Sequence, residues 1–325
     1  LPITQENRTH VLKALVKDPV PGKFEFFSVG GSSPVIQSFP HNTIPHVVWI
    51  NSEGIVSAIT EGEYLKAENV RKFLSGEPLN WNVKINTADF DYTKRLFNTS
   101  GKPCLANTTI AGYTPGAGMR VGTKVEDTQK RFYAINLSLL HLYALAYKSG
   151  LPFQHNRRIL QASDTSNYLY KGSGYYDEWR KKHCYTYEAT VTAAVSDDRI
   201  RSQMGASLDF AFNLKTGIEQ RLVKCLVLSC NSDTLNHLSA DTTLKAISSA
   251  DLVFELNKIP GMPPVINECR EQLSILLAEL QLNDIEAVNR ALQKQGLKLQ
   301  STERWLDMFV LTELSAPGSK AKNPN

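Results

Sequence analysis

The apolar and polar positions near the N-terminal end predict a β-hairpin followed by a helix. Val47 to Ile50 is a continuous apolar run, residues 51–54 are turn formers, and Ile55 to Thr60 is a second apolar stretch. Two such runs around a short turn are typical of antiparallel strands. Apolar residues then recur at helical spacing from Glu68 to Leu74, and the glycine at 76 ends the predicted helix.

The middle of the chain is less regular. Residues 80–130 alternate aromatic residues with turn formers, which predicts irregular structure and short strands in a connector packed on its neighbours. Ile135 to Tyr147 is apolar on nearly all sides, which predicts a buried helix. Residues 315–325 are rich in Pro, Gly, Lys and Asn and predict a disordered tail.

The C-terminal half repeats itself at an offset of 83 residues. Each copy is predicted to contain a helix, a short strand and a final apolar strand. The final strand runs from Leu222 to Leu228 in the first copy and from Leu306 to Leu311 in the second. A helix from Leu244 to Asn257 and a strand from Pro263 to Glu268 are predicted before the second copy. One constant offset and one shared order of elements indicate an internal duplication, with an arginine at the start of each final strand. The matching residues are Leu214-Lys215, Arg221 and Val227-Leu228 in the first copy, and Leu297-Lys298, Arg304 and Val310-Leu311 in the second.

Length, composition and charge argue against a single small domain, a nucleic-acid-binding protein and a membrane-spanning chain. With 325 residues and 42% hydrophobic content, the chain can bury more than one core. Its net charge of +4 is small and dispersed, and the basic run from Arg180 to His183 is interpreted as a solvated loop, so no nucleic-acid partner is predicted. No apolar stretch is long enough to span a membrane.

The five cysteines and seven histidines show no metal-binding spacing, and no cofactor is predicted. Cys225 and Cys230 lie five apart on a predicted strand, so alternation places them on opposite faces, where they can neither pair nor chelate a metal. The cysteines are interpreted as buried free thiols. His46 is the only histidine for which a function is predicted. An equally good interpretation is a histidine at a strand end whose ring nitrogens are hydrogen-bonded to backbone groups.

The predicted hairpin is preceded by Ile44-Pro45-His46, and this segment resembles the thioredoxin-like (TlpA-type) thiol–disulfide oxidoreductases of the bacterial envelope. The resemblance implies a cis Ile44–Pro45 bond, a geometry that proline adopts far more readily than other residues. It further implies that Ile44, Pro45 and His46 bind the partner, which would be a protein thiol or disulfide of the envelope.

The chain contains no Cys-x-x-Cys, so the resemblance covers the peptide-binding side of that fold without its redox pair. The first residues, Leu1 to Ile3, are interpreted as the end of a strand that leads into a helix from Gln5 to Lys17, capped by Thr4. We therefore expect a fragment whose missing upstream part holds the first strands, the cysteines and any membrane anchor of a periplasmic or envelope protein. No catalytic residue is expected within the chain itself, and no redox turnover from it alone.

Residues 131–314 resemble an uncharacterised α+β domain common in soil bacteria. The resemblance rests on Pro264 to Glu268, on Ala291-Leu292 and on Gly296 to Leu299. Where that family usually has Thr-Gly after the glutamate, this chain has Cys269-Arg270. The resemblance brings no known catalytic residue with it.

The sequence thus predicts an α/β part followed by an α+β part: a partial thioredoxin fold and then a duplicated α+β domain. The predicted boundaries are 1–79 for the thioredoxin-like half, 80–130 for the connector, 131–314 for the duplicated domain and 315–325 for the tail. Two functions fit this organisation. The chain is either part of an envelope thiol–disulfide oxidoreductase with an accessory domain used for interaction, or a non-catalytic envelope binding or scaffold module.

Overall fold

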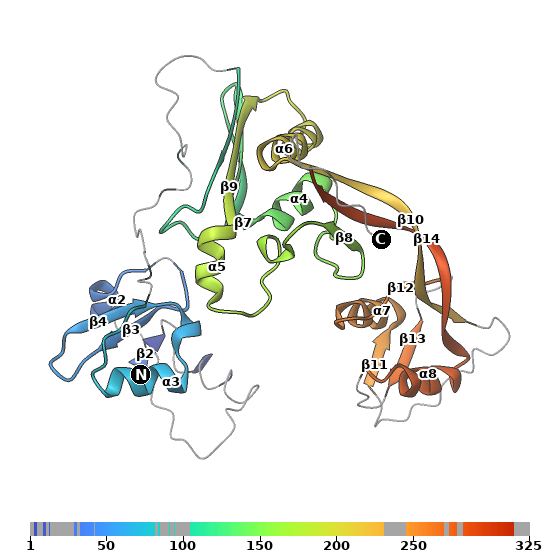
Figure 1. The fold of residues 1–325 in the computed structure, drawn as a ribbon, viewed down its shortest axis with the longest axis horizontal. Coiled ribbons are helices and arrows are strands. Elements are labelled where there is room, and N and C mark those ends of the chain that lie inside the picture. The colour runs from blue at the N-terminus through green and yellow to red at the C-terminus, as the bar shows by residue number, and fades with distance from the viewer. Residues whose placement is uncertain are drawn as a thin grey trace.

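The chain forms a mixed α/β structure in three parts, which we call the N-terminal unit, the first lobe and the second lobe (Figure 1). Cys104, the expected tail and nearly all of the helix expected from Gln5 to Lys17 lie outside the described residues. The computed structural model describes residues 3–4, 9–10, 13, 29–30, 33–41, 43–81, 84, 91, 94, 105–230, 245–269, 273–277 and 282–314.

The N-terminal unit contains the predicted hairpin and helix. Its strands β3 and β4 pair antiparallel with Val47 opposite Thr60, which confirms the hairpin, and the helix predicted from Glu68 to Leu74 is present as α3. At the turn, the Asn51 side chain accepts hydrogen bonds from the backbone N–H groups of residues 53 and 55. Its elements are β1 (Ile3–Thr4), β2 (Val29–Gly30), α2 (Ser33–Ser38), β3 (Val47–Ile50), β4 (Val56–Thr60), η1 (Gly62–Tyr64) and α3 (Ala67–Leu74).

The first lobe is a four-stranded antiparallel sheet, in the order β5-β9-β7-β6, with helices α4 and α6 on one face (Figure 1). The segment predicted to be a connector contributes β5 and β6 to this sheet. Apolar residues of α4 and α6, such as Leu142 and Met204, pack with Phe132 of β7 in the first-lobe core. The elements are β5 (Ala106–Ala111), β6 (Arg120–Glu126), β7 (Gln129–Ser138), α4 (Leu139–Tyr147), β8 (Arg158–Gln161), η2 (Thr165–Asn167), α5 (Tyr176–His183), β9 (Cys184–Thr192) and α6 (Asp197–Phe212).

The helix predicted from Ile135 to Tyr147 is wrong in its first four residues, which belong to β7. The chain changes from strand to helix at Ser138, whose hydroxyl accepts a hydrogen bond from the His141 backbone N–H and so caps α4. This strand end is buried on both sides, so it lacks the alternation that would have distinguished it from a buried helix.

The second lobe repeats that change from strand to helix. The helix predicted from Leu244 to Asn257 begins only at Ser249, because residues 245–248 form a strand and Ser248 caps the helix that follows. Leu252, Ile275 and Val288 belong to the second-lobe core. The elements are β11 (Lys245–Ser248), α7 (Ser249–Lys258), β12 (Val265–Asn267), β13 (Ser274–Leu277) and α8 (Ile285–Gln293).

Two long strands, β10 (Leu214–Cys230) and β14 (Leu297–Glu313), connect the lobes. Each is one continuous strand of 17 residues, so the expected division into a short and a final strand is wrong. They pair antiparallel over their whole length, with Leu222 opposite Trp305 at the centre. Because hydrogen bonds between the two strands satisfy both backbones, neither strand needs to end between the lobes.

The 83-residue offset holds for both bounds of the long strands and for the residue before each. Asn213 and Gly296 both have a positive φ, 53° and 75°, which ends the preceding helical segment and starts the strand. The outer strands match as well: β12 runs parallel to β10 with Val265 opposite Leu226, and β8 runs parallel to β14 with Arg158 opposite Phe309. The sheet order is therefore β12-β10-β14-β8. From either end of the sheet, an outer strand is followed by a long strand that runs parallel to it.

Each long strand begins in the core of one lobe and ends in the core of the other. Leu214 packs in the first-lobe core and Leu228 in the second-lobe core, whereas β14 starts at Leu297 in the second-lobe core and reaches the first-lobe core at Phe309. Figure 1 shows the two strands crossing side by side from one lobe to the other. The lobes are thus built around shared strands.

Arg221 and Arg304, which match at the 83-residue offset, were predicted to lie at the start of a final strand. In the structure both lie near the middle of the long strands. Arg221 forms an ion pair with Glu219 on its own strand, and Arg304 pairs with Glu268 at 2.8 Å. Both arginines therefore have a carboxylate partner near the surface.

Candidate functional site

The loop before β3 carries the three residues predicted to bind a partner. The Ile44–Pro45 bond is cis, as predicted, and the Ile44 side chain is 82% exposed. The Pro45 ring packs against Gly62, where an added Cβ would lie only 2.9 Å from the Pro45 Cβ. A glycine at 62 therefore lets the backbone after β4 approach the loop closely.

Lys84 binds the backbone of this loop through its ammonium group. Its ammonium group donates hydrogen bonds to the carbonyl oxygens of Thr43, at 2.8 Å, and Pro45, at 2.5 Å, and lies 3.3 Å from the Glu61 carboxylate. Its backbone N–H also donates to the Ile59 carbonyl, which brings this residue alongside β4. Burial lowers the pKa of Lys84, and the charge of Glu61 opposes that shift. Sequence reasoning missed Lys84, because nothing in its neighbourhood distinguishes it from a solvated lysine.

His46 is partly enclosed beside the loop. Its ring stacks on His41, with 4.6 Å between the ring centroids and 9° between the planes. Burial lowers the pKa of His46 to about 4, helped by the nearby His41 and Lys84. The ring is therefore neutral near neutral pH, where it can accept or donate a hydrogen bond without bringing a charge.

We expect the His46 ring to titrate near pH 4 in the folded protein. An unfolded chain takes up this proton near 6.5, so the folded state loses stability as the pH falls from 6.5 toward 4, with no further loss below that range. Proton NMR of the imidazole ring measures the midpoint. In a His41→Gln variant the His46 midpoint should rise, since one positive neighbour is removed. A His46 midpoint near 6.5 in the unaltered protein would contradict the enclosed environment.

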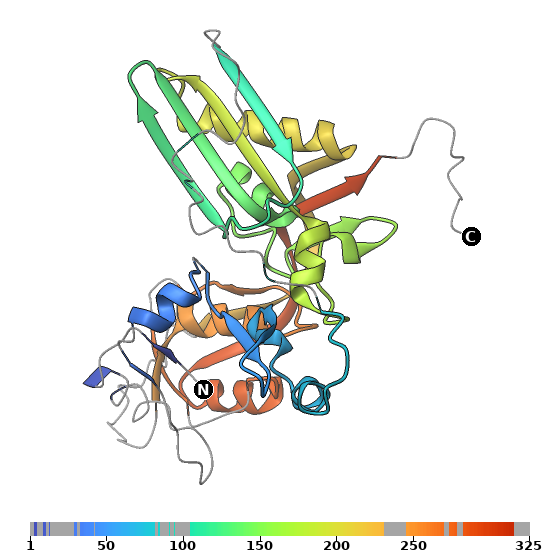
Figure 2. The same ribbon diagram turned by 90° about the vertical axis from the view of Figure 1, so that its left-hand side faces the viewer.

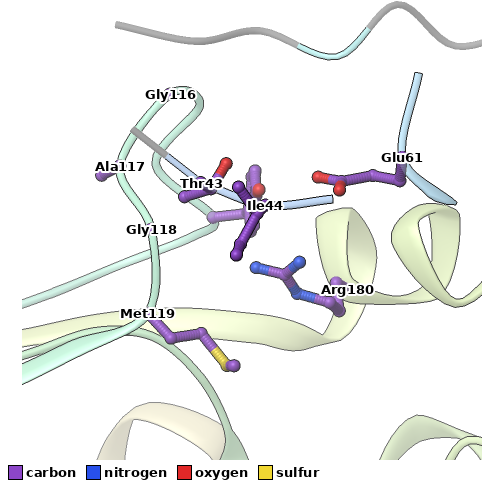
Figure 3. A pocket seen from close by; sticks show the side chains of 9 residues that line it. Thr43, Ile44, Glu61, Gly116, Ala117, Gly118, Met119 and Arg180 are labelled. Atoms are coloured by element: carbon purple, nitrogen blue, oxygen red, sulfur yellow. The ribbon is translucent and has the colours of Figure 1, made fainter. Parts of the chain in front are cut away.

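A pocket of about 130 Å³ lies beside the loop that precedes β3. Residues of this loop line one side of the pocket, and residues of the first lobe line the other side. Figure 3 shows the Arg180 side chain extending from α5 toward Ile44, and the Glu61 carboxylate pointing at the same space. An added Cβ at Gly118 would lie 2.9 Å from the Thr43 methyl group, so the two loops touch. The lining residues are Thr43, Ile44, Glu61, Tyr113, Gly116, Ala117, Gly118, Met119 and Arg180.

Helix α5 is fastened to the N-terminal unit, and in both views it lies between that unit and the first-lobe sheet (Figures 1 and 2). The Glu63 carboxylate accepts hydrogen bonds from the backbone N–H groups of Tyr176 and Asp177, both at 2.7 Å, at the N-terminus of α5. A carboxylate at this end of a helix is stabilised by the unpaired amides and the helix dipole. The Tyr64 and Tyr175 rings stack at 4.0 Å. These contacts fix the position from which Arg180 reaches the pocket.

None of the described cysteines is among the residues that line the pocket. Cys184 and Cys225 are buried free thiols, as predicted, whereas Cys230 and Cys269 are only half-buried. Burial raises the pKa of Cys184 to about 11, although Arg180 acts in the opposite direction. Nucleophilic thiols need a lowered pKa, and burial raises the pKa of both Cys184 and Cys225, so these two thiols are poor candidates for exchange chemistry.

Within the described part of the chain, no group of three or more His, Cys, Asp or Glu side chains is placed to hold a metal ion. No helix in that part is both long and apolar enough to cross a bilayer. What the site offers chemically is an exposed apolar side chain on a fixed loop, next to a polar pocket with one carboxylate and one guanidinium. No protein-family profile, curated protein or solved structure matches this chain.

Proposed function

We propose that Ile44, Pro45 and His46 form the partner-binding loop of a thioredoxin-like thiol–disulfide oxidoreductase of the bacterial envelope. The observation that carries the proposal is the exposed Ile44 on a loop whose flanking carbonyls are held by the buried ammonium group of Lys84. A loop fixed in this way can receive an extended peptide at little cost in conformational entropy. The hairpin of β3 and β4 and the helix α3 follow in the order that the sequence resemblance implies.

In this proposal the exchange itself is carried out by the two cysteines of a Cys-x-x-Cys pair, a motif that this sequence does not contain. Their thiolate attacks a disulfide sulfur of the partner, forms a mixed disulfide and releases the partner's other sulfur as a thiolate. The loop's role is to hold the partner's backbone during that step. The present chain contributes binding and orientation, and no catalytic residue.

We assign the two lobes to one duplicated α+β unit. Each lobe contains a strand, a serine-capped helix, an outer strand, a further strand, a helix and a long strand in the same order. The exchange of long strands between the cores gives the pair the arrangement of a domain-swapped dimer made from one chain. Among the described residues, helix α5, which lies between β8 and β9 and docks on the N-terminal unit, has no counterpart between β12 and β13. We therefore assign α5 the role of attaching the duplicated domain to the thioredoxin-like half.

The contact of Gly118 with Thr43 favours a second candidate, a non-catalytic envelope scaffold. In that alternative the first lobe covers the loop permanently, and the N-terminal unit serves as a platform. The two candidates differ in whether Ile44 is available to a peptide, and this can be measured.

The test is an NMR titration of the whole chain with a short extended peptide that carries one S-methylated cysteine. Partner binding predicts shifts in fast exchange at the backbone amides of Ile44 and His46. An Ile44→Ala variant should weaken these shifts several-fold. Leu74→Ala is the matched control, since Leu74 is a similarly exposed apolar residue of the same unit (76%, against 82% for Ile44) at the end of α3. Shifts confined to other surfaces, or an unchanged response in Ile44→Ala, would reject the binding loop and favour the scaffold.

A further inference from the structure

Cys230 and Cys269 lie at the same end of the parallel pair formed by β10 and β12. The register places Leu226 opposite Val265 and Leu228 opposite Asn267. Continuing the register by one further step of two residues brings position 230 opposite position 269. Directly opposed residues on neighbouring strands have Cα atoms about 5 Å apart, which is within the range that a disulfide spans.

Local hydrogen bonds bring the two thiols together. The Glu268 backbone N–H donates to the Leu228 carbonyl at 2.9 Å, which continues the ladder to the residue before Cys269. The Asn267 side chain then accepts from the Cys269 backbone N–H at 3.0 Å and turns the chain there. As a result the Cys269 sulfur lies back over β10, 3.8 Å from the Leu228 carbonyl oxygen, and hydrogen-bonds with Cys230.

The surroundings separate this pair from the other described cysteines. Cys230 and Cys269 both pack against the second-lobe core and are half-buried, whereas Cys225 is fully buried on the opposite face of β10 among residues such as Met308. Burial, followed by the neighbouring Cys230, raises the pKa of Cys269 to about 12. Oxidation should therefore be slow near neutral pH and faster as the pH rises, because the thiolate is the reacting form.

We propose that Cys230 and Cys269 are a redox pair that forms an intrachain disulfide. A disulfide oxidant accepts two electrons and two protons from the two thiols and becomes two thiols itself, while one S–S bond forms in the protein. The new bond ties the end of β10 to the segment after β12 and encloses β11, α7 and β12 in a covalent loop. It fastens the second lobe to the shared long strand, and it is independent of the partner-binding loop.

The test is a peptide map of the whole chain after incubation with oxidised glutathione at mildly alkaline pH. Remaining thiols are alkylated in denaturant before digestion with trypsin, which cleaves after Lys224, Lys245, Lys258 and Arg270. The expected product is peptide 225–245 joined to peptide 259–270, lighter by two hydrogen atoms than the sum of the two and lost on reduction. Alkylation of both Cys230 and Cys269 after oxidation would overturn the proposal.

Variants settle which sulfur is used, because Cys225 lies in the same tryptic peptide as Cys230. The Cys225→Ser variant should keep the joined peptide, whereas Cys230→Ser and Cys269→Ser should lose it. A link that survives in Cys230→Ser, or one that joins Cys269 to Cys184 or Cys104, would reject the assigned pair. If a serine variant folds poorly, fragment-ion sequencing of the joined peptides from the unaltered protein still distinguishes the two sulfurs, because the unlinked cysteine of peptide 225–245 carries the alkyl group.

Discussion

Leu228→Asp and Leu311→Asp are each expected to lower the free energy of unfolding by roughly 4 kcal/mol or more. The two leucines occupy equivalent positions 83 residues apart, and both side chains are fully buried. Each substitution removes apolar contacts and places a carboxylate where it has no partner. Urea denaturation followed by circular dichroism measures the loss.

The two substitutions should weaken different lobes, because Leu228 lies in the second-lobe core and Leu311 in the first-lobe core. Hydrogen exchange should show faster exchange mainly in α7 and α8 for Leu228→Asp, and mainly in α4 and α6 for Leu311→Asp. Leu222→Asp is the matched control: it lies on the same strand as Leu228 but is 51% exposed, so its effect should stay within about 1 kcal/mol. Equal loss of protection in both lobes from either change would contradict separate cores on shared strands.

Replacing Arg131 by Met is expected to cost about 3–5 kcal/mol, because it leaves the Glu188 carboxylate buried without its cation. Arg131 on β7 donates to the Glu188 carboxylate on β9 from Nε at 2.9 Å and from a terminal nitrogen at 2.6 Å. Both residues are only 5% exposed. Since Phe132 points into the first-lobe core, strand alternation places Arg131 on the sheet face away from the helices.

Two further variants test whether the pair itself is responsible. The double variant Arg131→Met with Glu188→Leu should recover most of the loss, because no buried charge is left unpaired. Lys124→Met should cost less than about 1 kcal/mol, since the Lys124–Glu126 pair on neighbouring β6 is exposed. Chemical denaturation curves compare the four proteins. A single Arg131→Met variant as stable as the unaltered chain would show that the ion pair is not needed.

Much of the N-terminal unit follows from local sequence. The hairpin from Val47 to Thr60 is specified by two apolar runs around a turn whose Asn51 side chain satisfies backbone amides. Helix α3 ends at Leu74, and Gly76, two residues later, has a positive φ that ends the helical conformation. Each of these signals acts over a few residues, so no distant part of the chain is needed to interpret it.

The residues of the proposed partner-binding loop and its pocket differ in the same way in how far the sequence points to them. Ile44, Pro45 and His46 were proposed from the sequence, because the resemblance to thioredoxin-like proteins rests on the short segment that contains them. Lys84, Gly118 and Arg180 were not, although they hold or face the same loop. Lys84 is 41 residues from Thr43 along the chain, and Arg180 comes from another lobe, so only folding brings them together.

The sequence by itself determined the hairpin and the 83-residue offset, since these depend on short-range chemistry and on direct identity between residues, whereas the cis geometry of the Ile44–Pro45 bond was implied by the family resemblance. Tertiary structure decided where strands become helices at Ser138 and Ser248, because an apolar run buried on all sides has no period to show which it is. It also decided that β10 and β14 each continue for 17 residues. Their polar middle sections, which look like breaks in the sequence, stay extended because each strand supplies the hydrogen-bond partners of the other.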